Sequence, residues 1–180
     1  MVVDPTLELL RYRVLATMAS MESLDSENLT PLADIPLGKL RVDATRLHAV
    51  CRYHKGVQKS DPSLGPNDVR KVAVHPVALA PEWERYAEFL LFHEFLHALG
   101  HAGHDRIFRK LEADWPDYEA TQMGETFGTH LRERNAKWRW LCPQCGWNTA
   151  RSVKSRGRYL CRGCRVKLVD ESLELTISTS

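Results

Sequence analysis

The stretch HEFLHALGHAGHDRIFRKLE, residues 93–112, decides the fold of this chain. It opens with an H-E-x-x-H motif inside a run of strong helix formers, residues 82–99, whose apolar side chains cover most of the helix circumference. His93 and His97 lie four residues apart on one helical face, so both imidazoles can bind one metal ion. Glu94 can reach a water activated by that ion. The motif therefore predicts two zinc ligands and a catalytic general base on a buried helix.

A catalytic zinc site needs a third protein ligand and one open position. His101 and His104 are the nearest candidates. In an unbroken helix His104 would lie roughly 16 Å along the axis from His93, too far to share the ion. Gly100 and Gly103 allow the helix to stop and the chain to fold back, which favours His104 as the third ligand. A downstream carboxylate, Glu119 or Glu125, is the alternative.

The remaining regular structure is predicted from periodicity and turn signals. The predicted helices are 5–19, 105–113 and 118–135, and the predicted strands are 47–54, 69–75 and, with a weaker pattern, 40–44. Strands followed by helices predict an α+β domain in which a small antiparallel sheet packs against the helix of residues 82–99.

Four cysteines near the end of the chain form two C-x-x-C pairs separated by fifteen residues, a spacing typical of a structural zinc site. The predicted ligands are Cys142, Cys145, Cys161 and Cys164. Gly146 and Gly163 are expected to ease the two turns, and residues 156–158 suit a hairpin tip. Such a four-cysteine zinc ribbon leaves no position for water or substrate. Cys51 falls in an apolar alternation and is expected to be a buried thiol.

The ribbon carries basic residues without acidic ones between Cys142 and Lys167, which leaves it at about +5 with zinc bound. These seven candidates for nucleic-acid contacts are Arg151, Lys154, Arg156, Arg158, Arg162, Arg165 and Lys167. Trp138, Trp140, Trp147 and Tyr159 add aromatic surfaces. Stacking on aromatics in a basic groove would suit single-stranded DNA or another nucleic acid. Alternatively, the tryptophans pack the ribbon and the cations keep it soluble.

The composition, 43% hydrophobic and 27% charged, is typical of a soluble protein, and the sequence lacks an apolar run of the roughly 20 residues that a membrane span requires. No secretory signal pattern is present at the start. We expect a cytoplasmic monomer without membrane association. In a reducing compartment paired cysteines are more often metal ligands than disulfides.

Residues 93–112 together with the Cys142 to Cys164 module resemble the SprT-like, Spartan-related family of zinc metallopeptidases. In that family the third histidine is followed by an aromatic residue in the pattern H-G-x-x-F or H-G-x-x-W. His104 to Phe108 match this pattern except that Asp105 replaces the glycine. The resemblance spans roughly residues 40–170. It implies a zincin-type peptidase fold, His104 as the third ligand, and action on DNA-bound or DNA-crosslinked proteins.

Together these patterns predict a SprT-like metallopeptidase domain over 1–136, a zinc ribbon over 137–172 and a disordered tail over 173–180. The predicted activity is zinc-dependent hydrolysis of peptide bonds in a protein substrate, with one catalytic and one structural Zn²⁺. An alternative is a nucleic-acid-binding or transcription-associated zinc protein with little or no peptidase activity. A hydrolase of non-peptide amides is a third hypothesis.

Overall fold

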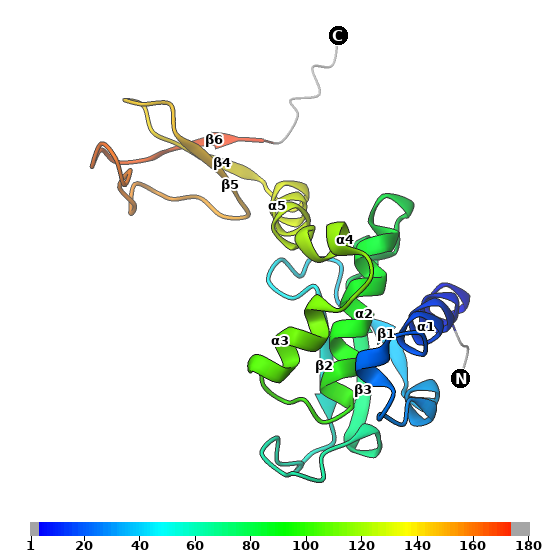
Figure 1. Ribbon diagram of the computed structural model, residues 1–180. Coiled ribbons are helices and arrows are strands. Elements are labelled where there is room, and N and C mark those ends of the chain that lie inside the picture. Colours follow the sequence, from blue (N-terminus) through cyan, green and yellow to red (C-terminus); the bar gives the residue numbers. More distant parts are fainter. Residues whose placement is uncertain (1–3, 174–180) are drawn as a thin grey trace. The chain divides into compact units, whose positions relative to one another are not determined.

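The computed structural model describes residues 4–173 and has a mixed α+β fold, as the sequence predicts (Figure 1). The chain divides between Gly124 and Glu125 into two compact units. The predicted domain boundary, in contrast, lies between residues 136 and 137, where the cysteine module begins. Except for Leu173, the tail predicted over 173–180 lies outside the described residues. None of the helices among residues 4–173 combines the length and apolar character needed to cross a membrane.

The first unit is built from four α-helices and a small sheet. The helices are α1 (Pro5–Met18), α2 (Glu84–Ala98), α3 (Arg106–Ala113) and α4 (Tyr118–Gln122), and short 3₁₀ helices cover Glu22–Leu24, Thr30–Asp34, Pro66–Asp68, Pro76–Leu79 and Pro81–Trp83. Two of these short helices lie in the acidic segment of residues 21–36.

The sheet of the first unit contains β1 (Leu37–Lys39), β2 (Ala49–Tyr53) and β3 (Val69–Val74) in the order β1-β3-β2. The prediction of a wholly antiparallel sheet is wrong, because β1 pairs with β3 in parallel while β2 pairs with it in antiparallel. The predicted strand over 40–44 is also wrong. The third strand lies just before it, since Leu37 pairs with Val72.

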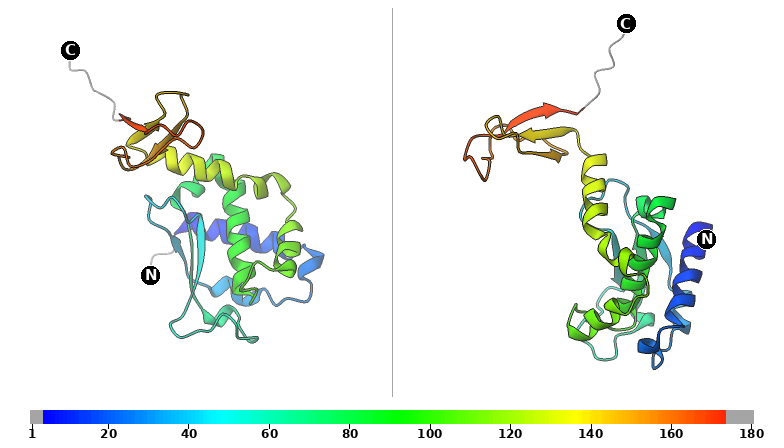
Figure 2. Two further views of the ribbon diagram at one scale, coloured as in Figure 1. Left: turned by 90° about the vertical axis from the view of Figure 1, so that its left-hand side faces the viewer. Right: turned by 45° about the horizontal axis from the view of Figure 1, so that its top comes forward.

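Helix α2 lies at the centre of the first unit, as its all-round apolar surface predicts (Figure 2). It contacts β2, β3, α1 and α4. The buried stripe of α1 contains Leu7, Leu10, Val14 and Met18. At the surface, Arg85 of α2 binds both carboxylate oxygens of Asp117, each at 2.6 Å, and Glu119 at 2.9 Å, which ties α4 to α2.

In the second unit a short helix precedes a three-stranded antiparallel sheet. Helix α5 covers Gly124–Arg134, and the strands β4 (Trp138–Leu141), β5 (Asn148–Arg151) and β6 (Val169–Ser172) have the order β5-β4-β6. The single helix predicted over 118–135 is therefore wrong, because the chain breaks it at Met123. The buried core of the sheet and its turns is small: Trp140, Cys142, Cys161 and Leu168.

Candidate metal centres

Three histidines of the first unit come together as predicted. His93 and His97 lie on α2 and His104 precedes α3, and one ligand atom of each lies within 4.8 Å of the others. The Nε2 atoms of His93 and His104 are 3.1 Å apart. Two nitrogen ligands of a tetrahedral zinc ion lie about 3.3 Å apart, given Zn–N bonds of about 2.0–2.1 Å. The three side chains could thus hold one metal ion, and their spacing is consistent with zinc.

Gly100 explains how His104 returns to the helix that carries the other two histidines. The backbone N–H of His101 donates to Leu96 O at 3.2 Å and that of Gly100 donates to His97 O at 3.1 Å, the two bonds of a Schellman motif. Gly100 has φ +104°, and a Cβ atom there would lie 2.5 Å from Leu64 O. Gly103 has neither a positive φ nor a close neighbour, so only Gly100 is required for this turn.

Hydrogen bonds on the outer ring nitrogens orient the two helical histidines. His93 Nδ1 lies 2.8 Å from Glu112 Oε1, and His97 Nδ1 lies 2.7 Å from the backbone oxygen of His101. Since both partners are acceptors, Nδ1 carries the proton and the Nε2 lone pair remains for a metal, an arrangement typical of histidine ligands.

Glu112 is a residue of the candidate site that the sequence analysis does not predict. Its side chain is largely buried, with 15% exposed, and its second oxygen accepts from Arg109 at 2.6 Å. Burial opposes ionisation, but the hydrogen bonds from His93 and Arg109 outweigh it, and the net pKa of Glu112 is lowered. Helical periodicity could have pointed to it, because Glu112 lies four residues after Phe108 on α3.

The other candidates for the third ligand do not join the group. The His101 side chain is absent from it, and this residue contributes its backbone oxygen instead. Glu119 pairs with Arg85, and Glu125 is exposed at the start of α5. Within residues 4–173, the histidine group that could hold a metal contains neither carboxylate.

Phe108 packs against all three histidines. Its ring centroid lies 4.7–4.9 Å from those of His93, His97 and His104, and its side chain is fully buried. Asp105 is the N-cap of α3: its side chain accepts from the backbone N–H of Phe108 at 2.9 Å. The cap fixes the start of α3 and therefore the position of the aromatic ring.

Glu94 is buried beside the histidines, with 7% of its surface exposed. Burial raises its pKa to about 7, although His93 and a hydrogen bond from the backbone N–H of Cys51 oppose the shift. Burial also lowers the pKa of His97 to about 4, so that its ring is neutral at pH 7. A carboxylate with a pKa near 7 beside the neutral imidazole of His97 suits general acid–base chemistry.

Tyr53 and His75 form hydrogen bonds within the fold of the first unit. The Tyr53 hydroxyl donates to the backbone oxygen of His97 at 2.7 Å. His75 is fully buried, where its Nδ1 accepts from the Val77 N–H at 3.1 Å and its Nε2 lies 3.0 Å from Ala44 O. His75 is therefore a structural residue of the turn after β3.

The four predicted cysteines also come together, with their Sγ atoms within 4.8 Å of one another. The Sγ atoms of Cys145 and Cys161 are 3.8 Å apart, and all four thiols are free. Tetrahedral zinc with Zn–S bonds of about 2.3 Å places its sulfurs about 3.8 Å apart, whereas a disulfide bond is about 2.05 Å long. This group could also hold a metal ion consistent with zinc. Cys51, as predicted, is a buried thiol.

The two C-x-x-C turns repeat the same backbone pattern. The N–H of Gly146 donates to Cys142 O at 3.0 Å, and the N–H of Arg165 donates to Cys161 O at 2.9 Å. Gly146 has φ +72° and Arg165 has φ +60°. The expectation that Gly163 eases the second turn is therefore wrong, because Arg165 takes the left-handed conformation there. At the expected hairpin tip, Arg156 and Gly157 both have positive φ.

The thiols influence one another's protonation. Backbone N–H groups of Cys145 and Gln144 lower the pKa of Cys142 to about 7. In contrast, a hydrogen bond with the sulfur of Cys145, together with burial, raises the pKa of Cys164 to about 12, and repulsion from the neighbouring sulfurs adds to this shift. A divalent cation at the centre would remove this conflict, as expected of a structural thiolate site.

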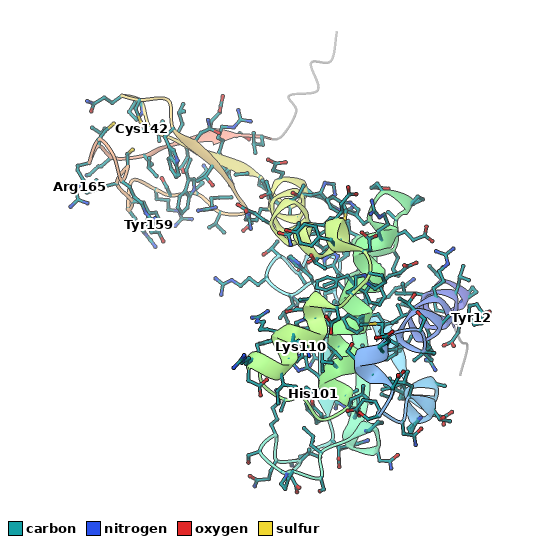
Figure 3. All side chains as sticks on the ribbon, viewed as in Figure 1. Tyr12, His101, Lys110, Cys142, Tyr159 and Arg165 are labelled. Carbon is teal, nitrogen blue, oxygen red and sulfur yellow. The ribbon has the colours of Figure 1, made fainter. Side chains whose placement is uncertain are left out.

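The aromatic residues of the ribbon divide into two kinds. Trp140 is buried in the ribbon's core, stacks on Tyr159 at 4.5 Å and donates from Nε1 to Val153 O at 2.8 Å. Trp138 packs against the same core, with Lys154 over its ring. Trp147 and the outer side of Tyr159 are about half exposed, and Tyr159 is labelled in Figure 3.

Six of the seven predicted basic contacts are exposed, and the seventh, Arg151, is half-buried with its guanidinium 5.1 Å from the Trp140 ring. The exposed six are Lys154, Arg156, Arg158, Arg162, Arg165 and Lys167. A hollow of about 420 Å³ beside Cys145 and Cys161 is lined by Trp147, Arg151 and Arg162. It joins an exposed aromatic ring to two guanidinium groups next to the cysteine cluster.

Comparisons of the chain with protein-family models, with curated proteins and with solved structures found no match.

Proposed function

We propose that the chain is a zinc-dependent metalloendopeptidase of the SprT-like type. The observation that carries this proposal is the inward-facing Nε2 group of His93, His97 and His104 next to the buried carboxylate of Glu94. Three imidazoles with an adjacent carboxylate are the donor set of a catalytic rather than a structural zinc site. A zinc ion bound there supplies Lewis-acid activation of water and of a carbonyl group.

Each residue of the site then has a distinct task. Glu94 takes the proton of the attacking water and delivers it to the leaving amine, for which a pKa near 7 is suitable. Glu112 and the His101 carbonyl hold the rings of His93 and His97 in one tautomer and orientation.

A peptide substrate is favoured over a small amide by the strand beside Glu94. β2 is an edge strand of its sheet, and the Cys51 N–H, which points away from β3, reaches the Glu94 carboxylate. An extended peptide can pair with such an edge through its main chain. His104 is exposed, so the site is accessible from solvent.

The test compares the wild-type chain with Glu94→Gln for cleavage of casein and for zinc content. The proposal expects two zinc ions per chain in both proteins and loss of cleavage in the variant. If Glu94→Gln retained both zinc ions and cleaved casein as fast as the wild-type chain, Glu94 would not be the general base. If both proteins held a single zinc ion, only the ribbon site would bind metal. A panel of small amides tests the non-peptide alternative.

A second candidate function is nucleic-acid binding by the ribbon, favoured by six exposed cations and by the hollow that joins Trp147 to two arginines. Single-stranded DNA would contact the cations through phosphates and Trp147 through stacked bases. Trp147→Ala should weaken binding without changing how binding depends on salt concentration, because base stacking releases no counterions. Salt-sensitive binding together with an inactive wild type would favour the non-enzymatic alternative.

A further inference from the structure

A second basic surface lies on the first unit, remote in sequence from the ribbon. The outer face of the β1-β3-β2 sheet, here called the sheet face, contains a hollow of about 430 Å³. Five cations line it: Lys39, Arg41, Arg52, Arg70 and Lys71. The opposite face of the sheet is covered by α2, so the cations occupy the solvent side.

A β-bulge concentrates these charges. The pairing shifts so that Arg52 lies opposite Lys71 while the next residue, Tyr53, lies opposite Val69, which leaves Arg70 as the extra residue of β3. Regular alternation would turn one of the neighbours Arg70 and Lys71 inward, but both line the hollow. The bulge therefore adds a cation to the exposed face.

The arrangement is unfavourable for the isolated fold. Arg52 and Lys71 are like charges directly opposite each other on antiparallel strands, which destabilises a sheet. Lys39 pairs with Asp4 and Arg41 with Asp43, but no carboxylate among residues 4–173 forms an ion pair with Arg52, Arg70 or Lys71. A bound polyanion would supply the missing counter-charges.

We propose that the sheet face binds the phosphate backbone of single-stranded nucleic acid. Neighbouring strands lie about 4.8 Å apart, so the cations are spaced closely enough to meet successive phosphates of one chain. Arginine forks bind phosphate oxygens in pairs. No aromatic side chain lines this hollow. Bases therefore cannot stack on it, and it lacks the aromatic anchors that are typical of membrane-surface binding. The contact is therefore with the backbone and independent of base sequence.

The test measures binding of a fluorescent 30-nucleotide single strand to the full chain by anisotropy over a range of KCl concentrations. In Arg70→Gln/Lys71→Gln, two lost phosphate contacts should reduce the slope of log affinity against log salt by about 1.4 and weaken binding about tenfold near physiological salt. Arg106→Gln/Lys110→Gln removes two exposed cations from α3 and is the matched control, with affinity expected within twofold of the wild type.

Two further measurements keep the proposal open to refutation. Arg70→Lys/Lys71→Arg should bind like the wild type, since it keeps both charges, and thermal melting should show that every variant folds. Equal binding by the sheet-face and α3 variants would overturn the proposal. Polyglutamate that displaces the fluorescent strand as well as unlabelled single strand does would also overturn it, because the partner would then be an acidic protein. A third contrary result is that Arg70→Gln/Lys71→Gln binds the strand normally but loses binding to phosphatidylserine vesicles, because the partner would then be a membrane.

Discussion

Removing the Glu112 carboxylate should weaken zinc binding at the histidine site without unfolding the chain. The hydrogen bond between His93 Nδ1 and Glu112 is 2.8 Å long and mostly buried. Loss of such a partner to a metal-bound histidine typically reduces metal affinity 10- to 100-fold, equivalent to about 1.4–2.7 kcal/mol. In Glu112→Ala we expect this full reduction. Arg109, left without its partner, is 60% exposed and water can solvate it, so the cost to folding is small.

The assay is competition for zinc against a chromophoric chelator, with the ribbon zinc as an internal reference in the same chain. Glu112→Gln keeps an oxygen acceptor for Nδ1–H but no charge, so its affinity should lie between those of the wild type and Glu112→Ala. Glu82→Ala removes an exposed carboxylate from the 3₁₀ helix Pro81–Trp83, which precedes α2, and is the matched control. Affinity of Glu112→Ala within twofold of the wild type would refute the orienting role.

Three other perturbations have defined outcomes. Gly100→Ala should destabilise the first unit by at least about 1–2 kcal/mol and weaken zinc binding, because the φ of +104° is unfavourable for alanine and the Cβ atom would collide with Leu64 O. Gly103→Ala is the control and should change neither stability nor zinc affinity. Denaturant titration measures the stability, and chelator competition measures the affinity. Arg85 holds the pKa of the Asp117 carboxyl group below its usual value. The wild-type chain should therefore be more stable than Asp117→Asn above pH 4, and this difference should disappear on further acidification. Urea unfolding of both proteins at several pH values measures it. Chelation of the ribbon metal should melt the small core around Trp140, visible in tryptophan fluorescence, while protection of α2 in hydrogen exchange persists.

Both candidate metal centres could be predicted from the sequence because their spacings are local. Backbone geometry alone brings together the side chains of two histidines that lie four residues apart on a helix. It does the same for the two cysteines of each C-x-x-C pair. His104 lies close to the two helical histidines, because the glycine at position 100 permits the chain to reverse there. The roles of these residues in catalysis and zinc binding remain predictions.

Features that depend on distant pairing were not predictable in the same way. β1 has three residues and no clear alternation, and it forms only because Leu37 pairs with Val72 across the fold. Helical periodicity places Glu112 on the same face of α3 as Phe108, but its contact with His93, nineteen residues away on another helix, depends on how α3 packs against α2. The bulge at Arg70 likewise follows from the register between β2 and β3, and no local residue pattern marks it.

Arg165 offers a route to engineering the ribbon for heat resistance. It occupies in the second turn the place that Gly146 has in the first, and its φ of +60° costs a residue with a Cβ atom about 1–2 kcal/mol. Arg165→Gly should therefore raise the melting temperature of the ribbon while removing one surface cation. Arg165→Gly thus separates the charge of this side chain from the strain of its backbone, and comparing nucleic-acid binding by the variant and the wild-type chain would measure what the charge contributes.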